Sequence, residues 1–295
     1  MSRPERTWLA EDTWRERERA HAGRMRRWTL PYLERRSRGE RHPVYDFLFQ
    51  YYRHRPSHLE RWQPGPGVVL GGPGAREFLA RGGYREADGG VVLDESAFTE
   101  KHARTARSTL ALLRATAARK PRLNCFGLHE WAMVHRQPAR EIRHGRLRLR
   151  LGTAGTDSVV EAHEIRCGHY DEFRFFTGAA RPRNELQPTR ATQAEHEQPG
   201  CLHANMDLYR AAYKLDPFVP AELVADCFEL AAEIRELDMR ASPYDLTELG
   251  YAPVAVETGA GRAEYVRAQA GFARRAEPLR ARLMAHCASL LTLRE

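Results

Sequence analysis

The segment Cys201–Leu246 constrains the fold more than any other part of this chain. Its apolar residues recur with helical spacing on both sides of a break, which Pro217 and Pro220 impose. The half after the break predicts a helix that is apolar around most of its circumference. Such a helix must be covered by other elements. The segment therefore favours a mainly α-helical fold, a single helical domain with a few short β-strands.

A row of carboxylates runs along the second of these helices. At i, i+4, i+7 and i+11 the four residues share one narrow stripe, and they are Glu222, Asp226, Glu229 and Glu233. Two interpretations stay open. The stripe is the one face that reaches water, or it points into a polar cavity, where carboxylates bind metals or act as acids and bases.

The composition is that of a globular protein, with 42% hydrophobic and 29% charged residues among 295. We expect a basic helical arm over residues 1–40 and one mostly helical catalytic-type domain over 41–295. No apolar run approaches the roughly 20 residues that a bilayer requires, and the first residues lack the apolar stretch of a secretory signal. These features predict a cytoplasmic protein with no membrane partner.

Cysteine usage and charge indicate what the chain binds. Five cysteines, an odd number, favour reduced thiols or metal ligands over a disulfide framework. The formal net charge is +8, and only three of the 47 basic residues are lysines. An arginine-rich, net-positive surface is compatible with DNA as a partner. A small-molecule substrate is the alternative partner, and the sequence leaves the cofactor unknown.

Residues 157–193 hold a dense group of side chains that bind metals or substrates. His163, Cys167 and His169 are candidate metal ligands, although their spacing matches no zinc signature. Further candidates follow in the same segment, and the Pro/Arg/Asn loop at its end suits substrate contact. These candidates are Tyr170, Asp171, Arg174, Arg183 and Asn184.

Two other segments add histidines. Residues 123–138 predict a short buried helix in which Cys125 and His129 are four residues apart. This pair is either half of a zinc site or, for the histidine, a hydrogen-bonded core position. After Cys201, the next predicted helix places His203 and Asp207 on one face.

Five stretches resemble a group of bacterial, mainly actinobacterial, proteins labelled 3-methyladenine DNA glycosylase. They lie within residues 42–250 and read HPVYDFLFQYYRHRPSHLERWQPG, CFGLHEWAMVHR, HYDEFRFFTGAARPRN, EQPGCLHANMDLYRAAYKL and ELVADCFELAAEIRELDMRASPYDL. The resemblance implies a DNA-repair hydrolase that removes alkylated purine bases.

A glycosylase of this kind needs an aromatic pocket for a cationic base and a carboxylate beside the sugar. The candidate catalytic residues are Glu130, Asp171 and Asp226. The candidate substrate-binding residues are His129, Trp131, Tyr170, Arg174, Arg183, Asn184, His203 and Asp207.

Two alternatives come from the residues themselves. The first is a small-molecule metalloenzyme, an oxygenase or hydrolase, with carboxylates of the 222–233 stripe and histidines as ligands in a helical core. The second is a binding or regulatory protein whose polar clusters are hydrogen-bond networks. Both enzymatic hypotheses require that the polar segments, distant in sequence, meet around one cavity.

Overall fold

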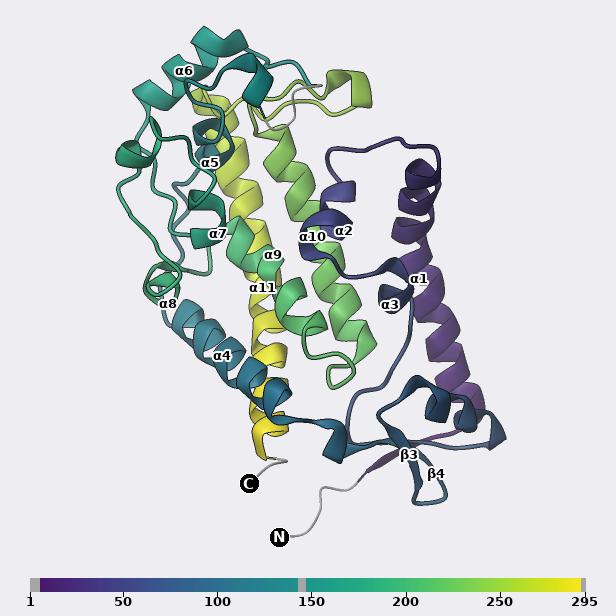
Figure 1. Cartoon of the computed structure of the whole chain (residues 1–295). Helices are drawn as coiled ribbons and strands as arrows, with labels where there is room; N and C mark the ends of the chain where they lie inside the picture. Colours follow the sequence, from purple (N-terminus) through teal and green to yellow (C-terminus); the bar gives the residue numbers. More distant parts are fainter. Residues whose placement is uncertain (1–5, 143–146, 293–295) are drawn as a thin grey trace. The chain divides into compact units, whose positions relative to one another are not determined.

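The computed structural model describes residues 6–142 and 147–292. It confirms the predicted class, since the described chain is mainly α-helical with one small four-stranded sheet (Figure 1). None of the described helices is long and apolar enough to cross a membrane.

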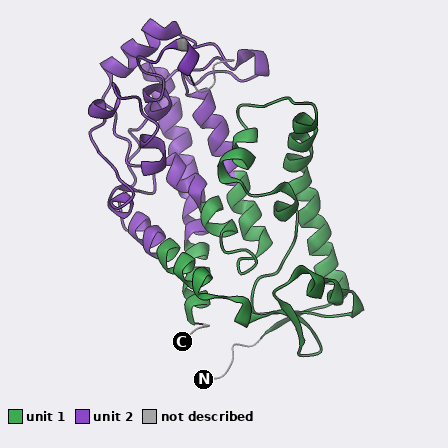
Figure 2. Cartoon of the chain, viewed as in Figure 1, with its two compact units in different colours: residues 1–110, 208–229, 281–295 green, residues 111–207, 230–280 purple. Residues whose placement is uncertain are grey.

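The chain forms two compact units (Figure 2). The first consists of residues 1–110, 208–229 and 281–295, and the second of residues 111–207 and 230–280. The predicted arm over residues 1–40 belongs to the first unit together with the sheet. Some helices run from one unit into the other, namely α4 (Glu100–Ala117), α9 (Leu202–Tyr213), α10 (Ala221–Arg240) and α11 (Gly259–Thr292).

The first unit combines helices with the sheet. Its other helices are α1 (Glu11–Ser37), α2 (Asp46–Tyr52), α3 (Pro56–Leu59) and the 3-10 helices Pro73–Arg81 and Glu95–Ala97. The strands are β1 (Thr7–Leu9), β2 (Val68–Leu70), β3 (Tyr84–Ala87) and β4 (Gly90–Leu93), in the order β1-β2-β4-β3. β1 pairs with β2 in parallel, and the other pairs are antiparallel. At the β3–β4 turn Asp88 and Gly89 both have positive φ, the conformation of a tight hairpin.

Large aromatic side chains form the core beside this sheet. Trp14, Trp62 and Phe78 are fully buried, and both tryptophan rings meet Phe78 edge-on at centroid distances of 5.5 and 6.2 Å. Edge-to-face pairs of this kind stabilise a core beyond the area that they bury. The Trp14 indole also donates a hydrogen bond to the Gly71 carbonyl oxygen at 2.9 Å, which fixes α1 on the end of β2.

The carboxylate stripe of α10 bonds to arginines. In the first unit Arg24 contacts Asp226 at 2.8 Å and Glu229 at 2.6 Å, and Arg282 contacts the second oxygen of Asp226 at 2.8 Å. The stripe therefore binds cationic side chains of α1 and α11 instead of lining a cavity there. Asp226, expected to be catalytic, holds helices together, because both its oxygens are engaged by guanidinium groups.

A second aromatic group surrounds His54 in the first unit. The imidazole stacks on Tyr213 at a centroid distance of 4.7 Å, and its Nδ1 lies 2.9 Å from the Tyr209 hydroxyl. Tyr209 in turn packs edge-on against Tyr52 and Phe228. The aromatic residues of α2 thus serve the core, one of the two roles that such a cluster can have.

Stability of the first unit is expected to fall in mild acid because of His54. Burial, followed by the charge of His58, lowers the pKa of His54 to about 4. The unfolded chain therefore binds a proton near pH 6.5 that the folded chain rejects, so this contribution is complete above pH 6.5 and is lost as the pH falls towards 4. We expect the free energy of unfolding to drop by about 2 kcal/mol from pH 8 to pH 5 through this group. Urea unfolding of the wild type and His54→Gln at both pH values measures it, and equal drops in the two proteins would contradict the assignment.

Candidate functional site

The second unit contains a cluster of buried ionisable side chains. Its other helices are α5 (Leu128–Ala132), α6 (Gly152–Ala162), α7 (Tyr170–Phe173), α8 (Gln193–His196) and the 3-10 helices Ala139–Glu141, Arg181–Arg183 and Thr247–Leu249. Six side chains from four helices are each at most 6% exposed. We call them the histidine–carboxylate cluster: His129 and Glu130 (α5), Glu172 (α7), His203 (α9), and Arg235 and Asp238 (α10).

Local sequence explains how these helices present polar groups inward. Phe126 and Gly127 both have positive φ, which makes the sharp turn that begins α5, and a Cβ on Gly127 would crowd Tyr265 at 3.2 Å. On α10, Arg235 and Asp238 are three residues apart and so lie on the same face. A polar pair of this kind on an otherwise apolar, buried helix must find partners in the protein interior.

Asp238 lies at the centre of the cluster and is fully buried. Its Oδ1 is 2.9 Å from His129 Nε2, and its Oδ2 is 2.7 Å from Arg235 Nη1. Arg235 Nη1 also bonds to Glu130 Oε1 at 2.9 Å. Two positive partners stabilise the charged form of Asp238, so its pKa lies far below the ordinary value even though burial opposes this.

His203 belongs to the cluster, but its Nε2 has no hydrogen-bond partner among the described residues. This nitrogen lies 3.6 Å from Glu172 Oε1 and 3.7 Å from Asp238 Oδ2, too far for hydrogen bonds. One ligand atom each from His129, Glu172 and His203 lies within 4.8 Å of the others, and the same holds for His129, Glu130 and Asp238. His203 and Glu172, which face each other without a hydrogen bond, suit a cation shared with His129.

The charges of the cluster lead to the same conclusion. Three carboxylates and one guanidinium leave two negative charges when both imidazoles are neutral, and buried charges must be offset. Burial alone would lower the pKa of His129, but Asp238 raises it well above the ordinary value. Burial raises the pKa of Glu172, and burial also lowers the pKa of His203 to about 3. A proton on His129 thus supplies one of the positive charges that a divalent cation would otherwise provide.

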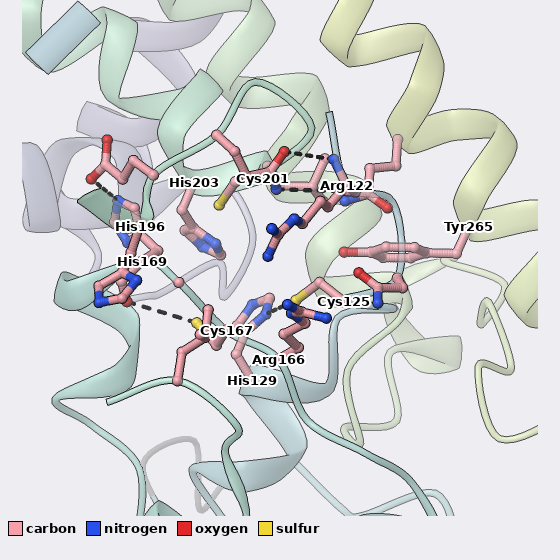
Figure 3. A pocket seen from close by; sticks show the side chains of 17 residues that line it. Arg122, Cys125, His129, Arg166, Cys167, His169, His196, Cys201, His203 and Tyr265 are labelled. Carbon is pink, nitrogen blue, oxygen red and sulfur yellow. Dashed lines mark hydrogen bonds and ion pairs between the residues drawn. The ribbon is translucent and has the colours of Figure 1, made fainter. Parts of the chain in front are cut away.

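A small cavity of about 30 Å³ adjoins the cluster (Figure 3). His129 and His203 form part of its wall. Cys125, Cys167 and Cys201 lie around the same space, as Figure 3 shows. A cavity of this volume has room for a water molecule or a small ion.

The predicted metal ligands separate in the structure. Cys167 and His169 both line the cavity. His163 does not belong there, because its Nδ1 lies 2.8 Å from the Val159 carbonyl oxygen and its Nε2 lies 3.0 Å from Arg262 Nη1. Both nitrogens are used at the end of α6, so His163 is corrected from a ligand to a structural residue.

His169 lies in a second, smaller group of charges in this unit. Its Nε2 is 3.5 Å from Asp207 Oδ2 and 3.6 Å from Glu197 Oε1. Burial would lower the pKa of His169, but these carboxylates raise it to about 9. Asp207, expected to bind substrate, therefore serves as a counter-ion to this imidazole.

Several predicted substrate-binding residues have structural partners. The Trp131 indole is fully buried and donates to the Ala241 carbonyl oxygen at 2.9 Å. Asn184 is buried, accepts from the Cys167 amide at 2.7 Å and donates to the Cys167 carbonyl oxygen at 2.9 Å. Arg183 donates to the Glu161 carbonyl oxygen at 2.8 Å. These three side chains shape the core and the loops instead of facing the cavity.

The remaining candidates form a group on and next to α7. Asp171 is buried, 3.3 Å from Arg190 Nη2 and 3.5 Å from Arg174 Nε. The Arg190 guanidinium lies 5.2 Å from the centre of the Tyr170 ring. Asp171 precedes the cluster residue Glu172, so it points about 100° away around the helix. Of the predicted catalytic residues, Glu130 is the one that lies in the cluster.

Sequence reasoning missed Glu172, Arg235 and Asp238. The sequence does contain a signal for the α10 pair. Arg235 and Asp238, three residues apart, alternate with the apolar residues Ile234, Leu237 and Met239. The sequence also marks the three segments that line the cavity. Cys125, Cys167 and Cys201 are each followed by a histidine within four residues, at 129, 169 and 203. The carboxylate stripe on α10 is easier to recognise in the sequence, but its residues pair with arginines of other helices and lie outside the cluster.

No family model, no curated protein and no solved structure matches the chain. The resemblance to proteins labelled 3-methyladenine DNA glycosylase therefore stays a prediction, and the geometry of the second unit carries the functional argument.

Proposed function

We propose that the protein is a metalloenzyme that binds one divalent transition-metal ion in its second unit and acts on a small molecule. The ligands are His129, His203 and Glu172. The observation that carries the proposal is that these three buried side chains, from three helices, bring their ligand atoms within 4.8 Å of one another.

The ligand set favours iron(II) and oxygenase chemistry. Two imidazoles and one carboxylate are typical of mononuclear non-haem iron sites that keep positions open for substrates. Zinc accepts the same ligands and would support hydrolysis through a bound water. The adjoining cavity of about 30 Å³ offers space for such a water or for dioxygen.

The other cluster members have supporting roles. Asp238 Oδ1 lies 2.9 Å from His129 Nε2 and its Oδ2 lies 3.7 Å from His203 Nε2, so a negative charge stands beside both imidazoles and attracts a cation to them. Arg235 bonds to Asp238 and to Glu130, so a permanent cation holds both carboxyl groups in position. Glu130 is thus a positioning residue in this proposal.

The glycosylase hypothesis has weaker support. The cavity beside the cluster and a second cavity of about 10 Å³ next to His54 and Tyr213 are both smaller than a purine. Trp131, which the hypothesis places against the base, is fully buried. The resemblance remains its main support.

Metal analysis tests the proposal. Protein expressed without a tag in iron-supplemented medium is expected to retain about one equivalent of metal at this site. Glu172→Gln keeps the shape but removes the charge, so we expect the affinity to fall at least about a hundredfold. Glu233→Gln is the matched control, because this glutamate lies on the surface of α10 in an ion pair with Arg275. It should leave the metal content unchanged.

Two outcomes would decide against the metalloenzyme. One is metal content indistinguishable between wild type and Glu172→Gln across iron, zinc, manganese and cobalt. The other is release of methylated bases from alkylated DNA by metal-free protein, at the same rate in Glu172→Gln, which would favour the glycosylase.

A further inference from the structure

We propose that the small cavity of the second unit binds a carboxylate group, and that Arg122 and Arg166 hold this group (Figure 3). The same cavity has His129 and His203 in its wall, so a bound carboxylate lies beside the proposed metal. A small carboxylic acid is then the substrate class. This last step rests on the proposed function, whereas binding of the carboxylate itself does not require the metal.

Arg122 provides a guanidinium group that has no partner in the protein. Figure 3 shows this group directed towards the middle of the cavity. The Arg122 main chain is fixed by the Gln198 side chain, which bonds to its amide at 2.8 Å and to its carbonyl oxygen at 3.2 Å. Within the part of the chain that the structure describes, the guanidinium itself has no hydrogen bond or ion pair. Its paired N–H donors match the two oxygens of a carboxylate.

Arg166 supplies a second donor to the same space. Its Nη2 pairs with Glu185 Oε1 at 3.1 Å, but its Nε is buried and has no hydrogen-bond partner among the described residues. Buried donors in folded proteins nearly always have an acceptor. A water molecule could satisfy this one nitrogen. Two guanidinium groups on one cavity favour an anion over a neutral water molecule.

The other charged groups of the cavity wall are matched to each other. His169 Nε2 lies 3.6 Å from Glu197 Oε1 and 3.5 Å from Asp207 Oδ2. Glu197 also accepts a hydrogen bond from Gln193 at 2.6 Å. Arg122 has no carboxylate of this kind opposite it, so a negative charge is what the cavity lacks.

The volume of the cavity selects the kind of anion. One water molecule requires about 10–15 Å³, so the cavity of about 30 Å³ holds a group about the size of two waters. A planar carboxylate suits this space, and tetrahedral phosphate and sulfate are larger. Arg122 and Asn124 are exposed lining residues, so the cavity has a side that faces solvent. The ligand is therefore a free anion of the size of formate or the carboxylate end of a larger acid.

Formate binding to metal-free, full-length protein tests the carboxylate site. Nuclear magnetic relaxation of carbon-13-labelled formate is the measurement, because it detects weak binding. We expect saturable binding to the wild type and an affinity at least about tenfold lower in Arg122→Gln and in Arg166→Gln, since each variant loses a charge-assisted hydrogen bond. Arg267→Gln is the matched control, because Arg267 is exposed on α11 and does not line the cavity. It should keep the wild-type affinity, and phosphate at equal ionic strength should not displace formate.

Propanoate distinguishes the two sources of the carboxylate. Displacement of formate by propanoate at the same or a lower concentration supports the site and identifies the end of a larger acid. Formate that binds while propanoate does not displace it supports the site and identifies a free small anion. The proposal is overturned if formate does not bind to the wild type, or if it binds to Arg122→Gln with the wild-type affinity.

Failure of this proposal is distinguishable from failure of the proposed function. Glu172→Gln should lose the metal and still bind formate. Arg122→Gln should lose formate binding and still retain the metal, because Arg122 is not among the proposed ligands.

Discussion

Asp238→Ala is expected to lower the free energy of unfolding by about 3–5 kcal/mol, because it leaves buried positive charge without its partner. Asp238 is fully buried and bonds to His129 and to Arg235 at 2.9 and 2.7 Å. Removing one member of a buried charge network leaves the others without their partner. Urea unfolding followed by circular dichroism at neutral pH measures the loss.

Glu233→Ala is the matched control for this prediction. It removes a carboxylate from the same helix, but the Glu233–Arg275 pair is about half-exposed on both sides. Exposed ion pairs contribute at most about 1 kcal/mol. If both variants lose the same stability, the charges around Asp238 are not buried in the way described here, and the argument for the cation site fails with them.

Metal affinity at the histidine–carboxylate cluster is expected to rise about tenfold for each pH unit between pH 6 and 8. Asp238 holds the pKa of His129 well above its ordinary value, so the metal-free protein carries a proton there at neutral pH. The metal must displace this proton, so lower pH weakens binding. His203, with a pKa of about 3, is already neutral and adds nothing to the slope.

Competition between the protein and a chelator for cobalt(II), at pH 6, 7 and 8, gives the slope directly. Calorimetry in buffers of different ionisation enthalpy counts the released protons independently. His54→Gln, altered in the first unit, should keep the wild-type slope. An affinity that does not change with pH would show that His129 is unprotonated before binding, contrary to the assigned charge balance.

Much of the candidate site is visible in the sequence only as a set of separate hints. The sequence predicts His129, Glu130 and His203 as functional residues, and they lie in one cluster. It predicts Cys167 and His169 as metal ligands, and they line the cavity beside the cluster. The sequence does not predict their partners Glu172, Arg235 and Asp238. The residues around a helical carboxylate in the sequence do not show whether it faces water or a buried imidazole.

The carboxylate stripe of α10 shows the converse. Its spacing correctly placed Glu222, Asp226, Glu229 and Glu233 on one face, yet spacing does not report what lies opposite. Arg24 and Arg282 bind Asp226 from helices more than 50 residues away along the chain. These arginines make the row of acids a set of ion pairs between helices.

The sequence alone determined the mainly helical class, the break at Pro217 and Pro220 and the burial of α10, because periodicity and proline geometry act within a few residues. Tertiary structure alone decided which polar groups meet. His129 and Asp238 are 109 positions apart, and only packing brings them to 2.9 Å. A buried charge is stabilised by its neighbours in space, whatever their distance along the chain.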